Sequence, residues 1–218
     1  MPVAVLSQAL KFPDPRLADA QGLVAIGGDL SVDRLLLAYQ SGIFPWTVSP
    51  VSWWSPDPRA IIELDGLHVG ESLQKILRKN VFHITKDKAF ADVIRQCATR
   101  APGRADTWIT QEFIDAYTRL HQRGHAHSLE CWLDGELAGG IYGVTIGGFF
   151  AGESMFHRVS NASKVALCHL VEHLRERGFK LLDIQMLTPI TKQMGGVTIP
   201  REEYLARLEK AIAAPCKF

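Results

Sequence analysis

Hydrophobic residues in this chain recur at the three- and four-residue spacing of a helix in several separate stretches. The clearest stretch begins after Thr110, which can cap a helix, and Gly124 can end it. Its apolar face comprises Phe113, Ile114, Tyr117 and Leu120. Comparable patterns predict helices over about residues 31–41, 72–79, 87–98, 161–177 and 201–213.

Shorter apolar runs lie between these helices and predict strands. The strongest hairpin signal is Asp134-Gly135, which separates the runs 128–133 and 137–146. A further strand follows the turn Gly147-Gly148, and others are expected at residues 61–64, 82–85 and 180–184. The order of elements therefore predicts an α+β fold.

The first sixty residues follow a different pattern. Four prolines and three tryptophans lie within residues 44–58, which predicts a stiff aromatic loop without regular structure. From about Ala60 onward strands and helices alternate, so we place a boundary near residue 62. The expected organisation is a small N-terminal α/β domain over residues 1–62 and a larger domain over residues 63–218.

Composition indicates a soluble globular protein. Of 218 residues, 47% are hydrophobic and 22% are charged, which excludes a disordered tail, a collagen-like repeat and a disulfide knot. Residues 1–10 carry no export signal, and the uncharged stretch 137–152 is interrupted by glycines and shorter than the ~20 residues of a spanning helix. The four cysteines are widely spaced without a CxxC pair, which indicates reduced thiols and a cytoplasmic location.

Basic side chains are concentrated in one segment. Residues 71–104 carry eight lysines and arginines and three acidic residues, a net charge of +5, whereas the remainder of the chain sums to −4. Such a segment is typical of a surface that binds a polyanion. A pair of solvated helix faces would give the same pattern.

Asp183-Ile184-Gln185, at the exit of the strand expected over residues 180–184, is the most chemically suggestive sequence. In a strand, Asp183 and Gln185 point to one face, so the carboxylate and the amide can share a hydrogen-bond network. Two solvent-facing side chains at a strand end are the alternative. Because the neighbouring residues are leucine and isoleucine, burial favours a functional network.

A second candidate is Gly152-Glu153-Ser154-Met155-Phe156. A hydrolase nucleophile elbow would need a glycine where Phe156 stands, which argues against Ser154 as a nucleophile. Glu153 is better interpreted as a strand carboxylate that accepts a hydroxyl or amine of a ligand, or that makes a structural hydrogen bond.

Metal and phosphate-loop chemistry are not expected. The residues with loose metal-like spacing fall on a helix, beyond its end and on a strand, where a shared coordination geometry would be accidental. They are His121, His125, His127 and Cys131. Gly27-Gly28-Asp29 lacks the lysine of a phosphate loop and is interpreted as a turn before a helix cap at Ser31.

Tryptophans add a further signal. Trp46 and Trp108 lie in loops or at loop edges, where an indole face can stack on a base. Trp53 and Trp54 are better explained as core of the N-terminal domain. Aromatic side chains beside a segment of net charge +5 suggest a nucleic-acid ligand.

Nine ordered motifs give the chain a recognisable likeness. They include Phe44-Pro45-Trp46, Gly152-Glu153-Ser154-Met155-Phe156 and Asp183-Ile184-Gln185. All nine lie at residues 22–30, 42–46, 53–59, 107–109, 124–128, 139–144, 152–156, 161–164 and 183–185. In these motifs the chain resembles the bacterial leucyl/phenylalanyl-tRNA–protein transferases, and the resemblance covers most of its length.

The resemblance implies a cytoplasmic enzyme that moves leucine or phenylalanine, with methionine a further candidate, from aminoacyl-tRNA to an N-terminal lysine or arginine. The modified acceptor protein would thereby be marked for degradation. It also implies a GNAT-like catalytic domain behind the small N-terminal domain, and neither a metal nor a coenzyme. The partners expected are therefore aminoacyl-tRNA and acceptor proteins.

Carried over by matching motif, the resemblance also assigns residues. Trp46 and Trp108 would hold the terminal adenosine. Glu153 and Ser154 would line the substrate site, with Glu153 facing the acceptor, and Asp183 and Gln185 would assist the attack. The basic helix would place Lys75, Arg78 and Lys79 on the tRNA backbone.

Two positions depart from the family pattern. Glu71 stands where a basic residue is expected in the basic helix, which bears on tRNA affinity. Residues 188–196 differ from the usual run, in which a histidine and a Ser-Leu-Gly-Ala sequence are common, and this bears on acceptor preference.

The expected chemistry requires no strong base, because an aminoacyl ester is already activated and a protein α-amine has a pKa of about 7.7–8.0. We expect the Gln185 oxygen to accept a hydrogen bond from the incoming amine while Asp183 polarises the Gln185 amide. Ile141, Leu167 and Leu170 are candidates for a dry pocket that holds the transferred side chain and rejects β-branched ones.

Two rival functions remain open. A coenzyme A-dependent acyltransferase of the same fold would need an Arg/Gln-x-x-Gly-x-Gly/Ala run ahead of a helix, which the sequence lacks. A catalytically silent tRNA-binding adaptor would keep Trp46, Trp108 and the basic helix, and would give Asp183 and Gln185 no role.

Overall fold

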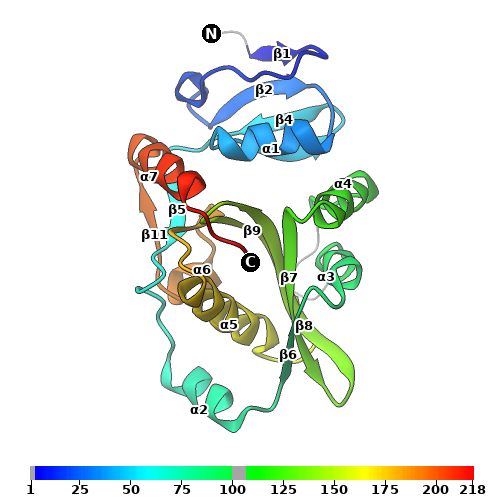
Figure 1. The fold of residues 1–218 in the computed structure, drawn as a ribbon, viewed down its shortest axis with the longest axis vertical. Helices are drawn as coiled ribbons and strands as arrows, with labels where there is room; N and C mark the ends of the chain where they lie inside the picture. Colours follow the sequence, from blue (N-terminus) through cyan, green and yellow to red (C-terminus); the bar gives the residue numbers. More distant parts are fainter. Residues whose placement is uncertain (1–2, 100–106) are drawn as a thin grey trace.

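Two β-sheets and seven α-helices make up the fold in the described part of the chain (Figure 1). The structure is a computed structural model that describes residues 3–99 and 107–218. In these residues no helix is long and apolar enough to cross a membrane.

A four-stranded sheet with the order β1-β2-β4-β3 forms the N-terminal end of the molecule. Its strands are β1 (Ala4–Leu6), β2 (Leu23–Gly27), β3 (Phe44–Val48) and β4 (Val51–Trp54). A 3-10 helix, η1 (Pro15–Leu17), lies between β1 and β2. Helix α1 (Val32–Gln40) packs beneath the sheet, and Ser31 caps it by accepting a hydrogen bond from the Arg34 backbone, as predicted.

The prediction of a structureless aromatic loop is wrong for most of residues 44–58. Residues 44–54 form the β3–β4 hairpin, in which Pro45 pairs with Trp53. β3 is the edge strand of its sheet, where a proline is tolerated because one side has no neighbouring strand to receive a hydrogen bond. Trp53 is fully buried and Trp54 half-buried in the core, which confirms their interpretation as core residues.

The larger sheet has seven strands in the order β11-β5-β10-β9-β8-β7-β6. Neighbouring strands are antiparallel except β9 and β10, which are parallel. The strands are β5 (Arg59–Ile62), β6 (His83–Lys86), β7 (Ala126–Leu133), β8 (Glu136–Ile146), β9 (Phe149–His157), β10 (Leu181–Gln185) and β11 (Gly196–Ile199).

Tight turns join the central strands as the sequence predicts. β7 and β8 meet at Asp134-Gly135, both with positive φ, and β8 and β9 meet at Gly147-Gly148. Gly143 lies where the β8–β9 register shifts, and a Cβ there would come within 2.2 Å of the Ala151 carbonyl oxygen. Only glycine fits that close approach of two backbones.

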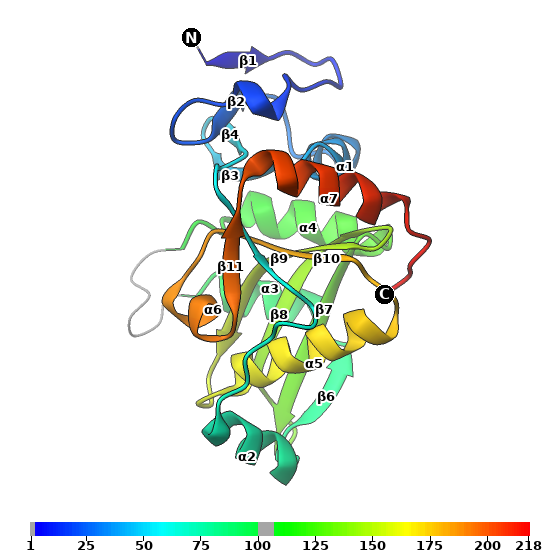
Figure 2. The same ribbon diagram turned by 90° about the vertical axis from the view of Figure 1, so that its left-hand side faces the viewer.

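Helices cover both faces of the larger sheet (Figure 2). α5 (Ala162–Glu176) and α2 (Glu71–Lys79) pack on one face, and α3 (Phe90–Cys97) and α4 (Gln111–Gln122) on the other. α6 (Pro189–Gln193) precedes β11, and α7 (Arg201–Ala213) runs beside the N-terminal sheet. Thr110 and Asn161 occupy N-cap positions as predicted, but neither side chain makes a capping hydrogen bond.

The two sheets share one continuous core. Leu35, Tyr39 and Trp53 of the N-terminal part belong to the same buried cluster as residues of α3, α4 and α7. β5 begins at Arg59 and lies inside the seven-stranded sheet, between β10 and β11. The α+β class with a small N-terminal part before a larger one is confirmed, whereas the boundary at residue 62 stays a prediction. Sequence patterns missed β1, β2, α6 and β11.

Candidate active site

A cavity of about 1110 Å³ opens where β3 of the small sheet meets β9 and β10 of the large one. β9 and β10 pair as far as Ala151 and Asp183, and beyond these residues both strands line the cavity instead of pairing. Of the residues predicted for the site, those that line it are Trp46, Trp108, Ile141, Glu153, Ser154, Leu167 and Gln185. The cavity is therefore lined by side chains that lie far apart in the sequence.

A bulge at the end of β10 determines the backbone conformation of Gln185, which lines the cavity. The register against β5 shifts between Asp183 and Gln185, and Gln185 has a φ of 54°, in the left-handed region that is uncommon for residues other than glycine. Its backbone amide donates a 2.9 Å hydrogen bond to Asp183 Oδ1. The strand alternation expected from the sequence is thus broken between these two residues.

Glu153 on β9 receives two hydrogen bonds. The Gln185 side-chain amide donates to Glu153 Oε1 at 3.0 Å, and the Tyr117 hydroxyl donates to Oε2 at 3.0 Å. Tyr117 also shares a short hydrogen bond with the Tyr39 hydroxyl of α1. A chain of polar groups therefore runs from the N-terminal helix to the amide in the cavity.

The surroundings of Glu153 bring its pKa close to neutral pH. Burial raises the pKa of Glu153 to about 7, although the hydroxyls of Tyr39 and Tyr117 act in the opposite direction. Burial, reinforced by the Glu153 carboxylate, raises the pKa of both phenols well above the usual value, so they remain donors. An ionised Glu153 can accept both hydrogen bonds that it receives, whereas a protonated carboxyl has to donate one of its own.

Asp183 does not line the cavity. It is fully buried, and its carboxylate receives a bidentate pair of hydrogen bonds from Arg59, at 2.9 and 2.6 Å, and a 2.9 Å hydrogen bond from Tyr204. Contrary to the expected arrangement, the Gln185 side-chain amide contacts Glu153, whereas Asp183 contacts only the Gln185 backbone among the groups of that residue. The carboxylate that contacts the Gln185 side-chain amide is therefore Glu153 and not Asp183.

Trp46 of β3 and Trp108, which precedes α4, both line the cavity. Both are half-buried. Trp46 packs edge-on against Trp54, with ring centroids 5.4 Å apart, and Trp108 packs edge-on against Phe113 at 5.0 Å. Each indole is thus fixed by an aromatic neighbour while it lines the cavity.

The apolar part of the cavity matches two of the three predicted pocket residues. Ile141 of β8 and Leu167 of α5 line it together with Leu182 and Ile184 of β10. Leu170 does not, because it lies one helical turn further along α5 and is fully buried in the core beneath that helix.

The basic helix lies apart from the cavity. Lys75, Arg78 and Lys79 are exposed on α2, at the end of the molecule opposite the N-terminal sheet (Figures 1 and 2). Leu73 anchors the helix in the core. Two further arginines of the basic segment, Arg100 and Arg104, lie outside the described residues.

Histidines with metal-like spacing serve other contacts. His127 Nδ1 lies 2.7 Å from Asp87, and His121 Nδ1 lies 2.8 Å from the Ala126 carbonyl oxygen. Within residues 3–99 and 107–218 no three histidine, cysteine or acidic side chains converge as a metal site would require.

Four residues around the site were missed by sequence reasoning. In the sequence pattern Tyr117 lies on the apolar face of a predicted helix and Tyr39 within the predicted N-terminal helix, so neither hydroxyl is marked as a donor. Arg59 and Tyr204 carry no pattern of their own that indicates a function. The one available signal is that Arg59 and Asp183 both belong to motifs that carry the family resemblance, those at residues 53–59 and 183–185.

The chain is similar in sequence to one family of known proteins over nearly its whole length. A family model described as leucyl/phenylalanyl-tRNA protein transferase matches residues 61–209, and one described as the N-terminal domain of that transferase matches residues 28–57. Over 215 residues the chain is 52% identical to a leucyl/phenylalanyl-tRNA–protein transferase of Syntrophobacter fumaroxidans, which covers 97% of this chain and 92% of that protein. A transferase of the same name from Desulforapulum autotrophicum is 50% identical over 226 residues, which covers 100% and 99%.

Solved structures are more distant. L-PGS from Bacillus licheniformis aligns at 13% identity with a TM-score of 0.44, which covers 77% of this chain and 54% of that one. A ribosomal-protein-alanine N-acetyltransferase from Brucella melitensis aligns at 17% identity with a TM-score of 0.34, which covers 46% and 76%. The assignment rests on the sequence matches, and by these the chain belongs to the leucyl/phenylalanyl-tRNA–protein transferase family.

Proposed function

We propose that this aminoacyltransferase moves leucine or phenylalanine, with methionine as a further candidate, from aminoacyl-tRNA to the N-terminal lysine or arginine of an acceptor protein. The new N-terminal residue marks the acceptor for degradation. The reaction uses neither a metal nor a coenzyme and takes place in the cytoplasm. Family membership and the geometry of the cavity support this proposal.

The observation that carries it is the contact between Glu153 and Gln185. Because the Gln185 Nε2 donates to Glu153, its Oε1 is the atom of the amide that can accept a hydrogen bond from an incoming amine. The amide lies in a cavity with an apolar wall and two indoles, as a bound aminoacyl-adenosine requires.

The chemistry is aminolysis of an ester. The neutral amine nitrogen of the acceptor attacks the ester carbonyl carbon, and a carbon–nitrogen bond forms. The bond from that carbon to the ribose oxygen then breaks, and the proton lost by the nitrogen ends on the departing ribose oxygen. Gln185 Oε1 orients the amine for this attack, so positioning supplies most of the rate.

The donor occupies the cavity in two parts. Trp46 and Trp108 offer indole surfaces for the terminal adenine, and such stacking is worth about 1–3 kcal/mol per base. Ile141, Leu167 and Leu182 surround the transferred side chain. A pocket of fixed shape favours unbranched and aromatic side chains over β-branched ones.

The N-terminal residue of the acceptor is positively charged and binds in the same cavity. Among the described residues that line it, Glu153 is the one carboxylate, and ionised it attracts an N-terminal residue with a basic side chain. His157, the last residue of β9, and Arg158, which follows it, also line the cavity. Residues Thr188 and Thr191 of the divergent segment 188–196 also line the cavity, which supports a role of this segment in acceptor preference.

The tRNA body binds mainly through its phosphates. The three exposed basic side chains of α2 offer contacts that do not depend on base sequence. Glu71 stands at the first turn of that helix, where its charge stabilises the helix N-terminus. We expect broad tolerance of tRNA sequence and a strong dependence of affinity on salt.

A tRNA-binding adaptor without activity is the second candidate. It would use the tryptophans and α2 but leave the hydrogen bond between Glu153 and Gln185 without a function. An acyltransferase with a coenzyme A donor is the third. Transfer assays with different donors separate the three.

We expect the purified protein to transfer radiolabelled leucine from charged tRNA to a protein with N-terminal arginine, and not to the same protein with N-terminal alanine. Replacing Gln185 by alanine removes the acceptor atom for the amine and should lower kcat about 100-fold, a loss typical of one positioned polar group. Gln122→Ala, at an exposed position on α4, is the matched control and should retain full activity. Binding of charged tRNA without any transfer would instead establish the adaptor.

The pH dependence should follow Glu153. Because its pKa is about 7, the transfer rate should fall as pH decreases through 7 and the carboxylate that holds Gln185 is protonated. Tyr117→Phe removes a hydrogen bond to the charged form, so the midpoint should move to higher pH. The acceptor amine titrates equally with both proteins, so the difference between single-turnover pH profiles isolates Glu153. Superimposable profiles would contradict this role.

Removal of charge from α2 should weaken tRNA binding without slowing the chemical step. In the variant with Lys75, Arg78 and Lys79 all changed to alanine, the slope of log Kd against log salt concentration should become shallower by about 2, and kcat at saturating donor should be unchanged. Lys210→Ala, an exposed position on α7, is the control. An unchanged salt slope would place the tRNA elsewhere.

A further inference from the structure

Arg59 is a deeply buried charged side chain next to the cavity, yet it does not line it. It lies on β5 with 1% of its surface exposed. Its guanidinium pairs with both carboxylate oxygens of Asp183, which is itself 0% exposed. Burial opposes the charge, but the Asp183 carboxylate outweighs this and raises the pKa of Arg59 above its usual value.

The remaining donors and faces of the guanidinium are also engaged. Arg59 Nη1 donates to the Gly42 carbonyl oxygen at 3.1 Å, and Nη2 also lies 3.3 Å from the Tyr204 hydroxyl. Its charged carbon lies 4.4 Å from the ring centroid of Tyr204 and 4.8 Å from that of Phe44. The side chain is therefore fixed by Tyr204 of α7, by Phe44 of β3 and by Gly42, which lies between α1 and β3.

Asp183 transmits this fixed position to the reacting amide. The Oδ1 atom that accepts from Arg59 Nε also accepts from the Gln185 backbone amide. This hydrogen bond closes the bulge in which Gln185 has its positive φ. A left-handed conformation costs a residue such as glutamine about 1 kcal/mol or more, so it persists where its surroundings hold it.

We propose that Arg59 is a positioning residue for aminoacyl transfer: together with Tyr204 it holds Asp183 so that the β10 bulge directs the Gln185 side chain into the cavity, against Glu153. This inference rests on the proposed function, in which Gln185 orients the incoming amine. Arg59 itself touches neither substrate.

The chemistry of the pair explains why an arginine serves here. Two parallel N–H groups match the two carboxylate oxygens and fix the carboxylate plane. A lysine would keep the charge but offer one flexible point of contact, so Asp183 could rotate and the bulge would no longer be held in a single geometry.

The first test is Arg59→Lys in the intact protein. We expect kcat for leucyl transfer to fall 10- to 100-fold while the KM for charged tRNA stays within threefold. If Arg59 acts through Gln185, the same substitution in a Gln185→Ala background should cost less than about twofold further. A 10- to 100-fold loss in both backgrounds would overturn the proposal.

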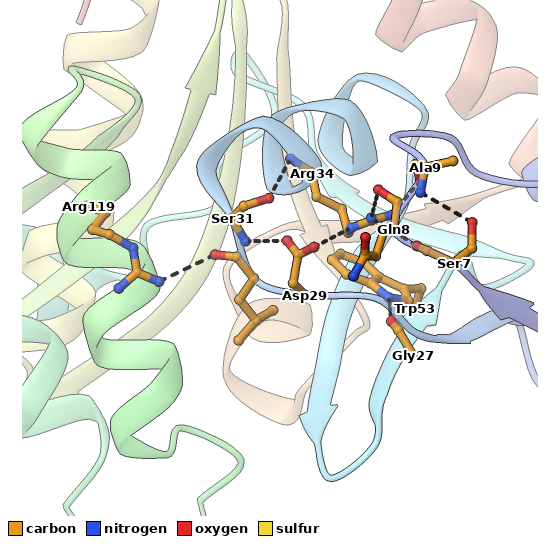
Figure 3. Close-up of polar contacts among 10 residues, drawn as sticks. Ser7, Gln8, Ala9, Gly27, Asp29, Ser31, Arg34, Trp53 and Arg119 are labelled. Carbon is orange, nitrogen blue, oxygen red and sulfur yellow. Dashed lines mark hydrogen bonds and ion pairs between the residues drawn. The ribbon is translucent and has the colours of Figure 1, made fainter.

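A matched control comes from the N-terminal part of the chain. Arg34 is as buried as Arg59, with 1% exposed, and binds Asp29 together with the carbonyl oxygens of Ser7, Gln8 and Ala9 (Figure 3). None of these partners lines the cavity. Arg34→Lys should lower thermal stability in the same way but leave kcat per folded molecule unchanged.

A second variant and a second readout complete the test. Tyr204→Phe keeps the ring against Arg59 but removes one hydrogen bond to Asp183, and it should lower kcat three- to tenfold in the wild-type background and not in Gln185→Ala. This variant tests the proposal if Arg59→Lys does not fold.

NMR gives a second readout. In the wild type and in Arg34→Lys, the hydrogens of the Gln185 side-chain amide should exchange slowly with solvent. In Arg59→Lys this slow exchange should be lost.

The outcomes separate the two proposals. If the wild type transfers no amino acid but the amide signal responds to Arg59→Lys, the proposed function falls, and what stands is that Arg59 fixes the position of Gln185. If the wild type is active and Arg59→Lys behaves as Arg34→Lys in both rate and amide exchange, the positioning role falls.

Discussion

The buried ion pair between Arg59 and Asp183 is the constraint on which the geometry of the cavity depends. Removing two charges from water costs several kcal/mol per ion, and apolar replacements of similar volume are often equally stable, so such a pair contributes little to stability by itself. What it does determine is geometry. It fixes the bulge at the end of β10, where the strand stops pairing with β9 and the cavity begins.

The same pair connects the N-terminal sheet to the wall of the cavity. Arg59 binds the carbonyl oxygen of Gly42 and lies against Phe44, and Tyr39 of α1 ends the chain of hydroxyls that leads to Glu153. Trp46 of β3 lines the cavity directly. The small sheet thus forms one wall of the cavity, and its residues share a buried core with those of the larger sheet.

Glu153 and Asp183 show how neighbouring carboxylates acquire different roles. Asp183 is matched by a guanidinium and a phenol and serves as an anchor. Glu153 receives hydrogen bonds from neutral donors, and burial raises its pKa to about 7. Glu153 is therefore sensitive to pH near neutrality, whereas Asp183 is held in place by its ion pair with Arg59.

Much of this arrangement could be predicted from the sequence. Helical periodicity and turn residues located α4, α5 and the β7–β8 hairpin, and strand burial indicated Asp183 and Gln185. Two local rules failed for physical reasons. Pro45 is tolerated in β3 because that strand is an edge, and the alternation that should place Asp183 and Gln185 on one face is broken by the bulge. Arg59 and Tyr204 could not be recognised because their partners are distant in sequence.

The conformation of Gln185 is the feature that depends on Arg59, so the most direct measurement is a pair of crystal structures, one of the wild-type protein and one of Arg59→Lys. With arginine, Gln185 should have a positive φ and its amide should lie within hydrogen-bond distance of Glu153. With lysine, the bulge should relax and the amide should leave Glu153. An unchanged Gln185 in the lysine variant would contradict the account.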